Sequence, residues 1–209
     1  SPLLDGKVSG FADTRLTFYK SNQSKIPSIT GAIIPEPVYT EQAHAEVILK
    51  KIERDIAPFN AENILDPVWV NSRGAMSRFD RGSIEIRIMD IQECPLADIA
   101  IVTLVVETLK TLVSEAYAPW EEQKKADTDS LAHLLQLVIR SGSKTDITDL
   151  QYLKYWHLQK PMKAMAIWRH IADNLVENGN QKVKRVMDHL MVLFDEGNLS
   201  DRILAKTGA

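Results

Sequence analysis

The sequence predicts an α+β fold, with short antiparallel strands in its first half and helices in the rest. Residues 84–88 alternate isoleucine with charged residues, which is the period of a strand with one buried face. After Pro119, apolar residues recur at helical spacing through most of the remaining chain. The 209 residues and 44% hydrophobic content suit one globular unit, or one such unit with a helical appendage.

Residues 1–38 are rich in glycine, proline and serine, and this composition predicts loops with short strands. The strand candidates are Leu16–Tyr19 and Ala32–Ile34, with Arg15 just before the first of them. Three prolines argue against a helix in this part of the chain: Pro27, Pro35 and Pro37.

The next element is a helix that begins at Thr40, a favourable N-cap, and ends at Pro58. Its apolar stripe consists of Ala45, Ile48, Leu49, Ile52 and Ile56. Val68–Val70 is predicted to be a strand, and Asn71–Gly74 a bend or bulge that precedes a hairpin.

The hairpin spans residues 78–88. If Arg81 and Gly82 form the whole turn, Arg78 lies opposite Glu85 and Phe79 lies opposite Ile84. This register places the apolar side chains on one face. The other face then carries the charged side chains Arg78, Asp80, Glu85 and Arg87.

The charged face has two interpretations. In the first, it is a solvated sheet surface whose Arg78–Glu85 ion pair contributes little to stability. In the second, Glu85 binds a hard cation through its oxygens while an arginine neutralises a phosphate. The residue pattern alone favours the first interpretation, because alternating charged residues are common in half-exposed strands.

The remaining elements are helical. Pro95 fits the first turn of a helix over 96–117 that is apolar nearly all round, so we expect it to be buried. Four further helical segments are predicted, with glycines ending the first, third and fourth. They cover about 131–141, 146–156, 161–178 and 183–196.

Composition excludes several classes of protein. A net charge of −3 provides no basic surface for nucleic acid or an anionic membrane. Cys94 is the single cysteine, so no internal disulfide forms, which fits a reducing cytosol. No signal peptide opens the chain, and the longest apolar run falls far short of the ~20 residues that a membrane helix needs. We therefore expect a soluble cytoplasmic protein without nucleic-acid or membrane partners.

Several common motifs are missing. Residues 142–145 (GSKT) lack the spacing of a phosphate-binding loop, and neither G-x-G-x-x-G nor H-E-x-x-H occurs. The histidines have no metal-ligand spacing: His44, His133, His157, His170 and His189.

Two segments carry a family resemblance. Residues 83–90 (SIEIRIMD) resemble the I-E-x-R-x-x-D strand of the glutamate–cysteine ligase-like carboxylate–amine ligases. Residues 1–15 (SPLLDGKVSGFADTR) resemble a second family segment, of the form S-P-x-x-x-G-x-x-[ST]-G-x-x-x-x-R. The blocks occur in the family's order, and the Glu-x-Arg core is also similar to one in glutamine synthetases.

The resemblance implies an ATP-dependent ligase that phosphorylates a carboxylate, such as that of glutamate. An amine, such as that of cysteine, then attacks the acyl phosphate, as in glutathione biosynthesis. ATP and Mg²⁺ are the implied cofactors. Glu85 is implied as the Mg²⁺ ligand and Arg87 as the catalytic contact to the transferred phosphate, with Arg78 and Arg15 binding phosphate or substrate.

The resemblance also implies a glutamine-synthetase-like antiparallel sheet in residues 1–118, followed by a helical region over 119–209. Because the chain starts inside a family motif, we expect it to be the C-terminal half of a larger ligase. It would then associate with the missing N-terminal half or with a second copy. We expect the chain by itself to be inactive. The alternative is a non-catalytic helical interaction module that retains degenerate ligase strands.

Overall fold

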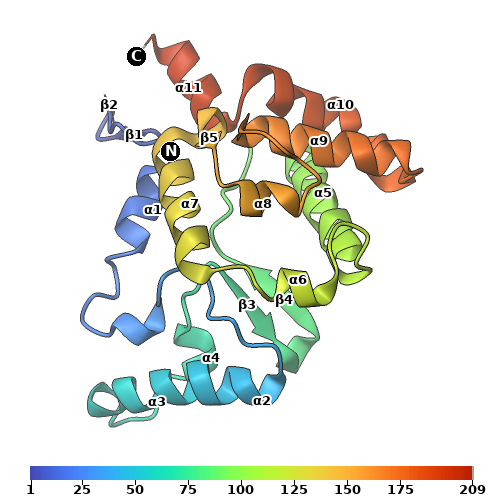
Figure 1. Cartoon of the computed structure of the whole chain (residues 1–209). Helices are drawn as coiled ribbons and strands as arrows, with labels where there is room; N and C mark the ends of the chain where they lie inside the picture. The colour runs from blue at the N-terminus through green and yellow to red at the C-terminus, as the bar shows by residue number, and fades with distance from the viewer. Residues whose placement is uncertain (209) are drawn as a thin grey trace. The chain divides into compact units, whose positions relative to one another are not determined.

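The computed structural model describes residues 1–208, which form helices and three two-stranded antiparallel sheets (Figure 1). This confirms an α+β fold; the glutamine-synthetase-like sheet and the division near residue 118 stay predictions. The chain divides into two compact units. Unit 1 contains residues 1–14, 91–126 and 134 onward, and unit 2 contains residues 15–90 and 127–133.

Unit 2 is built on a helical run of α2 (Glu41–His44), a π-helical turn (Ala45–Leu49) and α3 (Lys50–Ile56). The hydroxyl of Thr40 caps this run by accepting from the backbone N–H of Ala43, as the sequence predicts. The predicted stripe forms the core of the unit. The core residues are Ile29, Ile48, Ile52 and Ile56.

Two predicted strands of unit 2 are wrong, because both segments are helical. Leu16–Tyr19 lies in α1 (Thr14–Tyr19), where packing of Leu16 into the interior outweighs β propensity. Val68–Val70 lies in α4 (Pro67–Val70), because the carboxylate of Asp66 caps the helix and Pro67 occupies its first position. Ala32–Ile34 forms only an isolated bridge.

The predicted hairpin exists as β3 (Ala75–Arg78) and β4 (Ser83–Ile86), but its register differs by two residues. Arg78 pairs with Ser83, because a 3₁₀ turn precedes Gly82 and lengthens the connection. Gly82 adopts φ +58°, which glycine tolerates without strain. A shift by an even number leaves the faces unchanged, so the charged side chains still share one face.

The prediction of which hairpin face is buried is wrong. The charged face carries the buried side chains Met76 and Arg78, whereas Ile84 on the opposite face is 60% exposed. The structure explains the buried arginine, because two carboxylates neutralise its charge.

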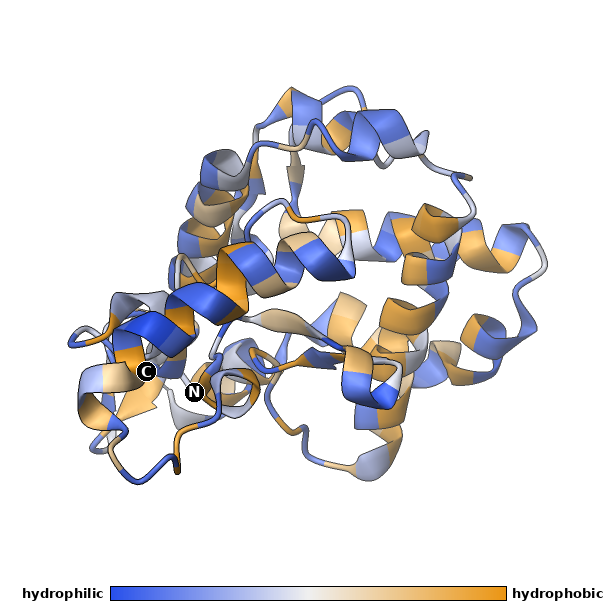
Figure 2. Ribbon diagram, turned by 90° about the horizontal axis from the view of Figure 1, so that it is seen from below, coloured by the Kyte–Doolittle hydropathy of each residue, from blue (hydrophilic) through white to orange (hydrophobic). Residues whose placement is uncertain are grey.

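Unit 1 is mainly helical. Its longest helix, α5 (Pro95–Val113), packs against α9 (Ala164–Glu177) and α10 (Gln181–Glu196), as Figure 1 shows. The shorter helices are α6 (Trp120–Gln123), α8 (Leu150–Lys154) and α11 (Leu199–Thr207). Helix α7 (Thr128–Ser141) begins in unit 2 and continues into unit 1. In Figure 2 most helices carry both hydrophilic and hydrophobic residues.

Two short sheets complete unit 1. They are formed by β1 (Leu3–Leu4) with β2 (Lys7–Val8), and by β5 (Asp146–Ile147) with β6 (Met162–Lys163). The second sheet corrects two predicted helix starts. Residues 146–147 and 162–163 pair with each other, so the helices begin later, at Leu150 and Ala164. The predicted burial of α5 holds for one side of the helix only.

Candidate functional site

The charged face of the β3–β4 hairpin brings three of the predicted site residues together. Glu85 lies between two arginines, with its Oε2 3.0 Å from Nη1 of Arg78 and its Oε1 2.8 Å from Nε of Arg87. Arg78 is 2% exposed and also donates from Nε and Nη2 to the two oxygens of Asp80, at 3.0 and 2.8 Å. The two carboxylates therefore fix Arg78 and neutralise it.

The electrostatics of this cluster favour its charged states. Burial opposes ionisation of Glu85, yet the bonds from Arg78 and Arg87 outweigh it and lower the pKa of the carboxyl. The bond from Arg78, more than any other factor, lowers the pKa of Asp80. The bond to Asp80 and the one to Glu85 raise the pKa of Arg78, although desolvation opposes them. Both carboxylates are thus ionised at neutral pH.

The cluster has an aromatic neighbour that the sequence pattern does not indicate. The exposed indole of Trp69 lies under two guanidinium groups, with the central carbons of Arg78 and Arg81 at 4.8 and 5.2 Å from the ring centroid. These are cation–π distances. No local pattern signals this contact, because it requires α4 to be a helix, whereas Val68–Val70 favours a strand.

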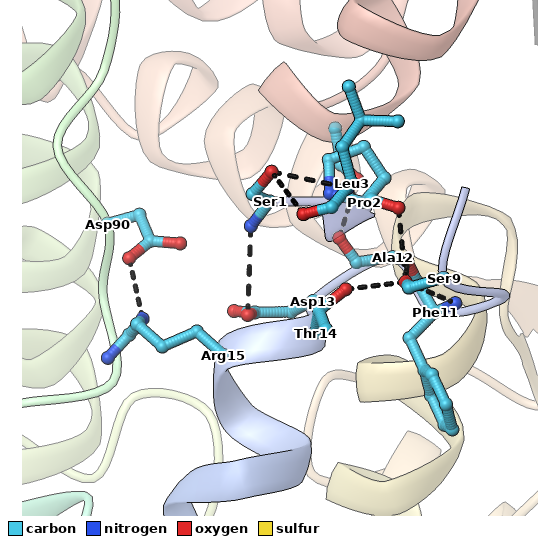
Figure 3. Close-up of polar contacts among 11 residues, drawn as sticks. Ser1, Pro2, Leu3, Ser9, Phe11, Ala12, Asp13, Thr14, Arg15 and Asp90 are labelled. Carbon is cyan, nitrogen blue, oxygen red and sulfur yellow. Dashed lines mark hydrogen bonds and ion pairs between the residues drawn. The ribbon is translucent and has the colours of Figure 1, made fainter. Parts of the chain in front are cut away.

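The two sequence blocks that carry the resemblance meet at an ion pair. Nε of Arg15 lies 2.8 Å from Oδ1 of Asp90, so the last residue of one block contacts the last residue of the other (Figure 3). Arg15 is therefore paired with Asp90 rather than with Glu85. Its Nη2 atom is buried and donates no hydrogen bond within residues 1–208. An unsatisfied guanidinium nitrogen of this kind is suited to an anionic ligand.

Ser9 of the first block holds the backbone that precedes Arg15. The Ser9 hydroxyl donates to the carbonyl of Pro2 at 3.0 Å, accepts from the backbone N–H of Phe11, and contacts the hydroxyl of Thr14 (Figure 3). Thr14 is the first residue of α1, and Arg15 follows it. The serine of the motif thus fixes the backbone that leads into this helix.

Arg73, which the sequence did not place, forms a second charged cluster in unit 2. It is buried and donates from Nε and Nη2 to the two carboxylate oxygens of Glu36, at 2.5 and 2.6 Å. Its Nη1 donates to the side chain of Asn71 and to the carbonyl of Ser28. Burial, and then the charge of Arg73, lower the pKa of His44, so this histidine is neutral at neutral pH.

Arg73, Glu36 and His44 line a cavity of about 160 Å³ that also reaches Met76 and Ile84 of the hairpin. The bonds from Arg73 lower the pKa of Glu36 even though desolvation by burial opposes them. The cavity therefore has an ion pair and a neutral imidazole on its wall. Arg73 and Glu36 are 37 positions apart in the sequence, so no local sequence signal could have paired them.

In the part of the chain that the structure describes, no group of three or more histidine, cysteine, aspartate or glutamate side chains could hold a metal ion.

Within the same residues, no helix is both long and apolar enough to cross a membrane.

Comparison with known proteins identifies relatives of the whole chain. A model of glutamate-cysteine ligase family 2 matches residues 1–209. A protein of Archaeoglobus fulgidus, described only as an uncharacterized protein, is 30% identical over 204 residues. The match covers 98% of this chain and 47% of the relative, so the chain spans about half the length of the relative it matches. No solved structure matches the chain.

Proposed function

The chain belongs to glutamate-cysteine ligase family 2, and from that membership we propose that it forms part of an ATP-dependent carboxylate–amine ligase. The observation that carries the proposal is the placement of Glu85 between Arg78 and Arg87 on one face of the hairpin. The reaction joins a carboxylate, such as that of glutamate, to an amine, such as that of cysteine. It proceeds through an acyl phosphate, with release of ADP and phosphate.

Arg87 is the residue that we propose to contact the transferred phosphate. Its Nε faces Glu85, and no residue within 1–208 accepts a hydrogen bond from its two terminal nitrogens. Those nitrogens provide planar, paired donors for phosphate oxygens. The positive guanidinium of Arg87 stabilises negative charge that moves with the phosphoryl group.

Glu85 fits the role of a single carboxylate ligand to Mg²⁺. Oε2 accepts a hydrogen bond from Arg78 and Oε1 forms an ion pair with Arg87, which leaves lone pairs on both oxygens for a metal ion. Mg²⁺ is commonly held by one or two carboxylates together with substrate phosphates, so one carboxylate suffices from this chain. When bound, Mg²⁺–ATP supplies the phosphoryl group.

Arg78 and Arg15 have different proposed roles. All three side-chain nitrogens of Arg78 are engaged by Asp80 and Glu85, so we assign it to positioning Glu85. Arg15 retains a buried nitrogen without a partner, which suits the carboxylate of the acceptor substrate.

The test is ADP release by the intact protein from Mg²⁺–ATP and glutamate, with and without cysteine. Release that depends on the amine supports the ligase. Glu85→Gln should lower turnover roughly 10- to 100-fold and raise the Mg²⁺ requirement. Arg87→Ala should lower turnover about 100-fold.

Glu46→Gln is the matched control, because it neutralises an exposed glutamate paired with Lys50 on a helix surface. Its turnover should equal that of the unmodified protein. Normal turnover by both site variants would overturn the residue assignment while leaving the ligase in place. Silence of the intact protein with a panel of carboxylates and amines would favour a non-catalytic interaction module.

A further inference from the structure

Helix α5 has an unusual distribution of polar and apolar residues. Its buried side carries Ala97, Ala100, Leu104, Glu107 and Thr108. Its opposite side exposes large aliphatic side chains that are 36% to 84% accessible. These are Leu96, Ile99, Val102, Val106, Leu109 and Val113, which we call the α5 stripe. The side facing solvent is therefore more apolar than the side facing the core.

The stripe is continuous along the helix. Successive members are three or four residues apart, so at 100° per residue the last five fall within an arc of about 80°. From Leu96 to Val113 the stripe runs about 26 Å. The side chains form one patch on the order of 500 Å², near the upper limit of what monomeric proteins leave exposed. A helix that is apolar on both sides is typical of a fully buried element.

We propose that the α5 stripe is a docking surface for the part of the intact protein that lies outside this chain. The relative from Archaeoglobus fulgidus is about twice as long as the segment that matches, so a homologous protein provides such a part. This inference concerns the assembly of the protein and does not rest on the proposed ligase activity.

A second copy of the chain is a poorer occupant, because the patch is smaller than the roughly 800 Å² per partner of a specific, stable dimer. A tethered segment needs less area, because it does not lose the free energy of bringing two molecules together.

The experiment measures thiol accessibility in the intact protein. In a Cys94→Ser background, Val106→Cys places one thiol at the middle of the stripe without a large change in volume or polarity. Lys184→Cys is the matched control, because Lys184 is an exposed residue of α10. Each variant is labelled with a maleimide in native buffer and in urea, at two protein concentrations tenfold apart.

The expected result is labelling of Val106→Cys at least 100-fold slower in native buffer than in urea, at both concentrations, with less than a tenfold difference for Lys184→Cys. Equal accessibility of the two thiols in native buffer would overturn the proposal. Protection that appears only at the higher concentration, with a dimer in sedimentation, would also overturn it and assign the stripe to a second copy.

Discussion

Glu107 offers a direct test of the packing in unit 1. This carboxylate of α5 is buried, yet it accepts from Nζ of Lys110 at 2.7 Å and from Nδ2 of Asn180 at 2.8 Å, with Nζ of Lys182 at 3.5 Å. Asn180 is the N-cap of α10, and its Oδ1 accepts from two backbone N–H groups of that helix. Glu107 therefore connects α5 to the start of α10.

The expected magnitude follows from the pKa of Glu107. The hydrogen bond from Lys110 and then that from Asn180 lower this pKa to about 2, although burial opposes them. The unfolded chain, with a pKa near 4.5, thus binds more protons between these values. The stabilising contribution is fully present above the unfolded pKa and is lost as the pH falls toward 2.

A difference of that size corresponds to about 3 kcal/mol without screening. The side chains of Lys110 and Lys182 are 55% and 65% exposed, however, so solvent screens much of their interaction with Glu107. We therefore expect a contribution of about 1–2 kcal/mol at neutral pH, more than half of which is lost by about pH 3.

The assay is urea unfolding, followed by circular dichroism at pH 7 and pH 3. Between these pH values the unmodified protein should lose about 1 kcal/mol more unfolding free energy than Glu107→Gln, which keeps an oxygen for Asn180 but has no titrating carboxyl. Glu46→Gln, on an exposed helix surface, should behave as the unmodified protein. An equal pH-dependent loss of unfolding free energy in the unmodified protein and in Glu107→Gln would refute the argument that its contacts hold Glu107 ionised.

Three further predictions concern other contacts. Arg73→Met should lower the unfolding free energy by about 3 kcal/mol in urea titrations, because it leaves Glu36 without its partner, and Arg73→Met with Glu36→Leu should recover most of that loss. Asn198→Ala should cost about 1 kcal/mol and speed hydrogen exchange in α11, since Asn198 caps that helix; unchanged exchange would count against the cap. Asp90→Asn should change thermal stability by less than about 1 kcal/mol, because its ion pair with Arg15 is half exposed, and a larger loss would point to hidden packing.

The hairpin shows which features the sequence can specify. Alternation alone placed Arg78 and Glu85 on the same face, because a strand has a period of two residues. The register depends on the length of the turn, which includes a 3₁₀ segment before Gly82. No residue pattern in the sequence predicts this segment. The burial of the faces depended on tertiary partners, since Asp80 and Glu85 make it favourable to bury Arg78.

Helix caps and long-range pairs set the other limits of prediction. Thr40 and the isoleucine stripe after it specified a helix in both sequence and structure. Val68–Val70 is helical although its β-branched residues favour a strand, because the side chain of Asp66 caps the helix. The pair of Arg73 with Glu36 could not be predicted, because it joins residues that are distant in the chain.

The hairpin and α5 share a property that neither shows by itself. In unit 2 the face with Arg78 is buried while Ile84 is exposed, and in unit 1 the side with Glu107 is buried while Val106 is exposed. Both arrangements satisfy buried charges with specific partners and leave aliphatic surface in water, which is the reverse of what hydrophobic burial favours in an isolated domain. The docking proposed for the α5 stripe accounts for this surface in unit 1, and the Archaeoglobus fulgidus relative extends beyond the segment that matches this chain.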